Sequence, residues 1–133
     1  MKLLEMKVVS KRKSELILLS NQLQELVQKQ AWQSGKITLF VPHTTAAVTI
    51  NENADPAVKD DILLGLDRIS PVLAEFQHYE GNSDAHLKSS LIGCSQELLL
   101  NAGKLVLGTW QGLYFCEFDG PRQRRIIVGF VGE

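Results

Sequence analysis

The last third of the chain consists of short apolar runs separated by turn residues, and this spacing limits the possible folds more than any other feature. Four such runs occur, at 97–100, 104–107, 113–118 and 125–131. Turn-forming residues at 101–103 and 119–121 interrupt them. Strands so close in sequence usually pair with one another, so we expect an antiparallel meander with hairpin turns at both interruptions.

The first half of the chain shows both strand and helix periods. Alternating apolar residues over 2–9 predict a half-buried strand, and 15–20 is its expected hairpin partner. A helical period follows, with Asn21 as the expected N-cap and Gly35 as the residue that ends the helix. Runs rich in β-branched and aromatic residues predict two further strands, at 36–41 and 46–50.

Two more helices are indicated by their N-terminal signals. Asp55 can cap free amides and Pro56 is tolerated in a first turn, so a helix is expected from there to Ser70. Asp84 is the expected cap of a shorter helix that ends near Gly93. Two-residue alternation mixed with capped helices predicts an α+β fold, with a large antiparallel sheet or sandwich and a few helices.

Length and composition set the broad class of the protein. The 133 residues, 44% hydrophobic and with a net charge of −1, suit a single compact domain over residues 1–133. No apolar run approaches the roughly 20 residues that cross a bilayer, and charges interrupt the N-terminus too early for a signal peptide. We therefore expect a cytoplasmic protein with no membrane partner. The absence of an extended basic face also argues against nucleic-acid binding. Cys94 and Cys116 are expected to be reduced and buried.

The three histidines are the main functional clue. His43 lies in the polar block PHTTAAVTINENADP, while His78 and His86 lie in HYEGNSDAHLKSS. Imidazole binds transition metals and moves protons near neutral pH, and carboxylates or amides accompany every copy. If the fold joins the blocks, they form one polar site. Two interpretations stay open: a three-imidazole site for zinc or another divalent metal, and a metal-free acid–base pocket.

Carboxylates and amides in the same blocks are further candidates. Glu52 can orient imidazoles, assist proton transfer or join a bound magnesium ion. Glu80 is assigned to the site, whereas Asp55 and Asp84 are assigned mainly to helix capping. The remaining candidate substrate-binding residues of the two blocks are Thr44, Asn51, Asn53, Gly81 and Asn82.

Two later segments add binding candidates. Glycines flank Trp110 and Gln111 in GTWQG, a pattern typical of a bulge or of close approach by a ligand or chain. Trp110 is either a ring-stacking residue or a core or subunit contact, and Gln111 is a polar contact. In DGPRQRR, Arg122 and Arg124 either hold phosphate oxygens or serve as surface charge on an exposed turn.

Three long runs carry a family resemblance. HTTAAVTINENADP, EGNSDAHLKSSLIG and LGTWQGLYFCEFDGPR, in this order and spacing, resemble the YjbQ-like family of secondary thiamine-phosphate synthases over nearly the whole chain. Two positions depart from the family pattern: Ser83, where a small apolar residue is common, and Cys94, which is often proline. The resemblance implies an α+β fold with a large antiparallel sheet, a homotrimer, and a polar pocket near subunit boundaries where the histidine blocks converge.

The resemblance also implies a reaction with small phosphorylated substrates. Hydroxymethylpyrimidine diphosphate and thiazole phosphate would be joined into thiamine phosphate. Diphosphate leaves as the thiazole nitrogen attacks, so the site must neutralise the growing charge and exclude water. The catalytic candidates are His43, Glu52, His78 and His86. The alternative is a non-catalytic trimeric module that binds a metal or a small phosphorylated ligand.

Overall fold

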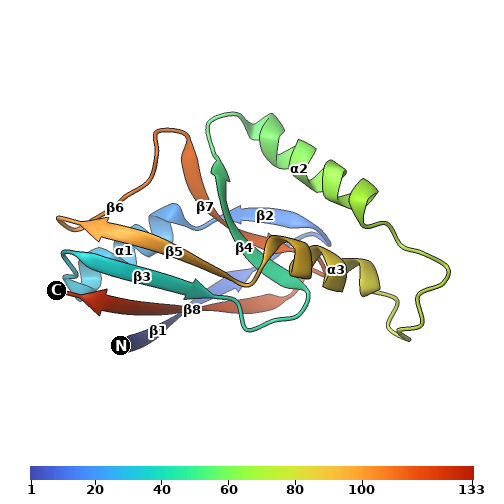
Figure 1. Cartoon of the computed structure of the whole chain (residues 1–133), viewed down its shortest axis with the longest axis horizontal. Helices are drawn as coiled ribbons and strands as arrows, with labels where there is room; N and C mark the ends of the chain where they lie inside the picture. Colours follow the sequence, from blue (N-terminus) through green and yellow to red (C-terminus); the bar gives the residue numbers. More distant parts are fainter.

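Every strand pairing in the computed structural model, which describes residues 1–133, is antiparallel. The strands are β1 (Lys2–Val9), β2 (Glu15–Leu18), β3 (Gly35–Phe40), β4 (Ala46–Glu52), β5 (Ser95–Asn101), β6 (Lys104–Leu105), β7 (Gln111–Glu117) and β8 (Gln123–Gly132). The helices are α1 (Ser20–Gln30), α2 (Pro56–Ile69) and α3 (Ser83–Ile92). The expected α+β class with a large antiparallel sheet is confirmed (Figure 1).

The strands form two sheets that pack against each other. The larger has the order β1-β8-β3-β5-β6 and the smaller the order β2-β7-β4. Alternation decides which side chains face inward. Ile37 of β3, Ile126 of β8 and Phe115 of β7 meet in a core that also receives Leu23 from α1. The other face of β7 packs beneath α2 and α3, through Tyr114 and its neighbours. The strand β7 is therefore buried on both faces.

The expected hairpins were only partly correct. β5 and β6 do form one, with Leu100 opposite Leu105. β1 and β2 do not pair, because β1 lies along β8 and β2 lies along β7. The turn at 119–121 likewise carries the chain from the smaller sheet to the larger one, instead of closing a hairpin. Alternation specifies which face of a strand is buried but does not specify its partner.

Helix ends also differ from expectation at three of the assigned residues. Asp55 does cap α2, since its Oδ1 accepts a hydrogen bond from the Ala57 amide at 2.9 Å. Asn21 is not a cap, because α1 already begins at Ser20. Gly35 starts β3, and α1 ends instead at Ala31 in a left-handed conformation. Asp84 lies inside the first turn of α3 and makes no cap.

The two cysteines have different surroundings. Cys116 is buried in β7, and burial raises its pKa to about 12. Cys94, which follows the end of α3, is exposed, so the expectation that both thiols are buried was wrong. None of the three helices is long and apolar enough to span a membrane.

Candidate functional site

The two histidine blocks meet at one cavity of about 440 Å³. The loop between β3 and β4 forms one wall, the segment leading into α3 forms another, and the turn between β7 and β8 forms the third. The lining residues are Pro42, His43, Thr44, Thr45, His78, Glu80, Asn82, His86, Asp119, Arg122 and Arg124. All three histidines therefore line the same polar cavity, as expected from their confinement to two blocks.

A second group of predicted site residues lies elsewhere in the chain. Asn51, Glu52, Asn53, Trp110 and Gln111 cluster where β4 ends and β7 begins, and none of them lines the cavity. Since strand residues advance by about 3.3 Å, roughly 20 Å of β4 separates Glu52 from the end that adjoins the cavity. Within one chain, Glu52 is therefore too far away to orient the imidazoles.

Local geometry explains part of this second cluster. A Cβ on Gly112 would lie 2.8 Å from side-chain atoms of Asn53 and Leu18. Gly112 is therefore required because these two side chains of the same protein pack against its backbone. Trp110 is 63% exposed and belongs to neither core. Gly81 also lies outside the cavity lining, although it joins Glu80 to Asn82 in a left-handed turn with φ +73°.

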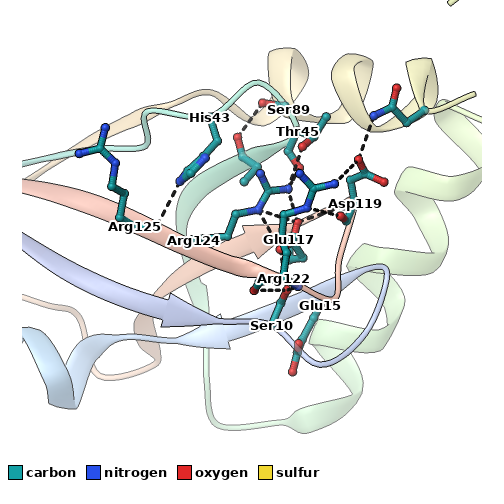
Figure 2. Close-up of polar contacts among 12 residues, drawn as sticks. Ser10, Glu15, His43, Thr45, Ser89, Glu117, Asp119, Arg122, Arg124 and Arg125 are labelled. Atoms are coloured by element: carbon teal, nitrogen blue, oxygen red, sulfur yellow. Dashed lines mark hydrogen bonds and ion pairs between the residues drawn. The ribbon is translucent and has the colours of Figure 1, made fainter. Parts of the chain in front are cut away.

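Arg124, which lines the cavity, forms a buried ion pair with Glu117 (Figure 2). Arg124 donates from Nε to Oε1 of Glu117 at 2.9 Å and from Nη2 to Oγ1 of Thr45 at 2.7 Å. Glu117 is fully buried and Arg124 is 5% exposed. The interpretation of Arg124 as a charge on an exposed turn was therefore wrong. Its Nη1 makes no hydrogen bond within the chain, and Arg124 lines the cavity.

The carboxylate of Glu117 is held in its charged form. Burial by itself would raise the pKa of Glu117, but hydrogen bonds from Arg124, the Ser10 hydroxyl and the Asp119 amide lower it below its ordinary value. Ser10 donates at 2.7 Å and Asp119 at 3.1 Å. The carboxylate thus fixes the plane of the Arg124 guanidinium through the Nε and Nη2 hydrogen bonds.

Arg122 is held more loosely at the mouth of the cavity. Its Nη2 donates to Oδ2 of Asp119 at 2.9 Å, and its side chain is about half exposed. The same Asp119 oxygen accepts from Nδ2 of Asn82 at 2.8 Å, so the turn is tied to the start of α3. Arg125 lies on the opposite face of β8, where it pairs with Glu5.

His43 has a structural partner on the backbone. β3 ends at Phe40, and beyond this point Nε2 of His43 accepts a hydrogen bond from the Arg125 amide at 3.0 Å (Figure 2). The neutral ring must then carry its proton on Nδ1. Burial, followed by the charge of Arg124, lowers the pKa of His43 below its ordinary value. His43 is therefore neutral at pH 7 and presents an N–H donor.

His78 and His86 are neighbours on the other side of the cavity. Their ring centroids are 5.4 Å apart with nearly perpendicular planes, and Nε2 of His78 lies 3.8 Å from Oε2 of Glu80. No three histidine, cysteine or acidic side chains are arranged to hold a metal ion. The three-imidazole metal site stays a prediction, and it requires His43 to leave the Arg125 amide.

Sequence reasoning missed Ser10, Thr45, Glu117 and Asp119. One usable signal was present: Arg124 is two residues before Ile126, so strand alternation puts it on the inward face of β8. A buried arginine requires a buried acid, and Glu117 is the acidic residue in the apolar run of β7. Ser10 and Thr45 carried no such signal, because each approaches Glu117 or Arg124 only through tertiary folding.

Comparison with known proteins gives a consistent result. The family model described as UPF0047 protein YjbQ-like matches residues 4–133. A UPF0047 protein of Methanocaldococcus jannaschii is 45% identical over 98% of this chain and 95% of its own length. The UPF0047 protein YugU of Bacillus subtilis is 44% identical, over 96% of this chain and 97% of its own.

Solved structures agree with these relatives. A YjbQ/UPF0047 family protein from Clostridium acetobutylicum superposes with a TM-score of 0.92 at 45% identity, covering 96% of this chain and 99% of that one. A hypothetical protein from Aeropyrum pernix gives 0.93 at 32% identity and covers both chains fully. From the family match and these identities, the chain belongs to the UPF0047 YjbQ-like family.

Proposed function

We propose that the protein acts as a thiamine-phosphate synthase, joining hydroxymethylpyrimidine diphosphate to thiazole phosphate and releasing diphosphate. The observation that carries the proposal is the buried Arg124, whose guanidinium is oriented by Glu117 and faces a cavity lined by three histidines. A pre-oriented cation needs no reorganisation when negative charge develops on a leaving group. Such a site suits the loss of diphosphate better than it suits hydrolysis of a neutral ester.

The proposed reaction assigns a role to each group. The thiazole nitrogen attacks the methylene carbon, the bond from that carbon to the diphosphate oxygen breaks, and diphosphate leaves with the electron pair. Arg124 and Arg122 neutralise the departing charge, and His78 or His86 donates a proton to it. His43 donates an Nδ1 hydrogen bond. No covalent enzyme intermediate is required.

A divalent metal is a further part of the proposal. Oδ1 of Asn82 is buried without a hydrogen-bond partner. Nδ2 of Asn82 lies 3.5 Å from Oε2 of Glu80, so the two side chains are neighbours. Amide and carboxylate oxygens are the ligands that magnesium prefers, whereas the imidazoles of His78 and His86 suit zinc. When bound there, the ion would supply additional positive charge beside the diphosphate.

We also propose a homotrimer in which Glu52 and Trp110 of one chain approach the cavity of its neighbour. The outer face of the larger sheet exposes apolar side chains that include Phe40, Leu99 and Val131, and such patches commonly mark subunit contacts. Light scattering on dilute protein is expected to give about three times the 14.8 kDa mass of one chain. A stable monomer with unchanged ligand binding would contradict a shared site.

The alternative is a non-catalytic trimeric protein that binds a metal or a phosphorylated ligand. Turnover and ligand affinity, measured on the same untagged sample, separate the two functions. A synthase produces thiamine phosphate and diphosphate in equal amounts, whereas a binding protein gives tight binding without product. Elemental analysis of the parent and of His86→Ala, run in parallel, shows whether either activity depends on a metal held by the cavity.

Arg122→Ala should weaken binding of inorganic diphosphate by roughly tenfold, the usual effect of losing one charge-assisted hydrogen bond. The side chain is about half exposed, so the free energy of unfolding should change by less than about 0.5 kcal/mol. Calorimetric titration and thermal melts measure the two quantities. Arg68→Ala removes the same charge from the exposed end of α2 and is the matched control. Equal losses in both variants would show that only long-range charge matters.

A further inference from the structure

A second cavity of about 460 Å³ lies beside α3 and shares the lining residues Thr44 and His86 with the polar cavity. Its other lining residues are Ser89, Ser90, Gly93 and Cys94. Positions 86, 89, 90 and 93 follow the helical repeat, so one face of α3 forms its wall. We call this cavity the α3 groove. Because Thr44 and His86 line both cavities, the two cavities are adjacent and His86 lies between them.

The chemistry of the α3 groove differs from that of the polar cavity. The polar cavity carries two arginines and two carboxylates, whereas the α3 groove contains no arginine, lysine or acidic side chain. The Ser89 hydroxyl is already used, since it donates to the Ala46 carbonyl at 2.6 Å. Small side chains leave room beside the helix, and a Cβ placed on Gly93 would meet no atom within 4 Å. A lining without cationic side chains suits an uncharged group better than an anion.

We propose that the α3 groove holds the uncharged ring of an organic diphosphate ester whose diphosphate group lies at Arg124. The ester carbon then lies at the junction, between Thr44 and His86, within reach of an attacking nucleophile. The inference rests on the proposed function for the diphosphate position and adds the place of the ring. It makes the residues of the α3 groove, Ser90 and Cys94 among them, the determinants of which ester binds.

The chain contains its own reporter for this subsite. Cys94 is exposed at the end of the α3 groove, while Cys116 is buried with a pKa raised to about 12 and stays unreactive. The rate of alkylation by iodoacetamide therefore measures access to the α3 groove. Inorganic diphosphate, which has no ring, should leave this rate nearly unchanged. Hydroxymethylpyrimidine diphosphate should slow it by roughly tenfold at saturation.

A space-filling variant provides the second measurement. The Trp side chain of Ser90→Trp would fill the α3 groove. This variant should bind hydroxymethylpyrimidine diphosphate roughly tenfold more weakly, or worse, and should bind inorganic diphosphate as the parent does. Leu91→Trp, at the next position on the exposed surface of α3, should affect neither ligand. If the ester binds but neither protects Cys94 nor responds to Ser90→Trp, the subsite is wrong and the diphosphate site stands. If neither ligand binds the parent protein, the proposed function and the subsite both fail.

Discussion

Glu117→Ala is expected to lower the free energy of unfolding by about 3–5 kcal/mol, because it leaves the Arg124 charge buried without its counter-ion. Urea denaturation followed by tryptophan fluorescence measures the loss. Glu97→Ala is the matched control, since that carboxylate forms only an exposed ion pair with Lys36 and should cost about 1 kcal/mol or less. Equal losses of stability in the two variants would contradict the claim that the buried Arg124–Glu117 pair stabilises the fold more than an exposed ion pair does.

The same pair predicts how stability depends on pH. The folded-state pKa of Glu117 lies below its ordinary value of 4.5, so the native state favours the charged form. This contribution is fully present above that ordinary value and is lost as the pH falls through the folded pKa. Glu117→Gln, which cannot ionise, should therefore show less loss of stability between neutral pH and acid than the parent. A parallel loss in both proteins would mean that other carboxylates govern acid unfolding.

Lys88→Met should lower the free energy of unfolding by about 3 kcal/mol. The Lys88 side chain is 3% exposed and lies between Asp67 of α2, at 2.5 Å, and Asp84 of α3, at 3.6 Å. Its removal leaves Asp84, which is 4% exposed, with only Lys13 at 3.7 Å. The ion pair between Lys88 and Asp67 joins α3 to α2.

A double variant separates lost charge balance from lost packing. Lys88→Met combined with Asp84→Asn removes both members of the buried pair, so no uncompensated charge remains. The loss of unfolding free energy in the double variant should be smaller than the sum of the losses in the two single variants. Urea denaturation of the four proteins provides the comparison. Strict additivity would show that Lys88 and Asp84 act independently.

The elements of the fold were largely predictable from the sequence, whereas the strand partners were not. Alternation of Met6 and Val8 identified the inward face of β1, and Asp55 with Pro56 identified the start of α2. Nothing in these local patterns distinguishes β8 from β2 as the neighbour of β1, because that choice depends on how two sheets pack together.

The site was predictable in part for a related reason. The confinement of three histidines to two polar blocks correctly indicated one cavity. Glu52 belongs to the same block as His43, but an extended strand carries it to the far end of the small sheet. Asp84 resembled a cap because acidic residues favour helix N-termini, yet burial beside Lys88 gives it an ion-pair role. Proximity in sequence is therefore a poor guide when a strand lies between two residues.

Calorimetric titration of the parent and Arg124→Lys with inorganic diphosphate tests whether Arg124 holds a diphosphate group in the cavity. Lysine keeps a positive charge beside Glu117 but loses the planar guanidinium that contacts Glu117 through Nε and Nη2 and has a further donor, Nη1. We expect the parent to bind diphosphate and Arg124→Lys to bind it roughly tenfold more weakly or worse, while Arg68→Lys on α2 binds as the parent does. Equal binding by all three proteins, or no binding by the parent, would contradict the assignment of this cavity as the diphosphate site.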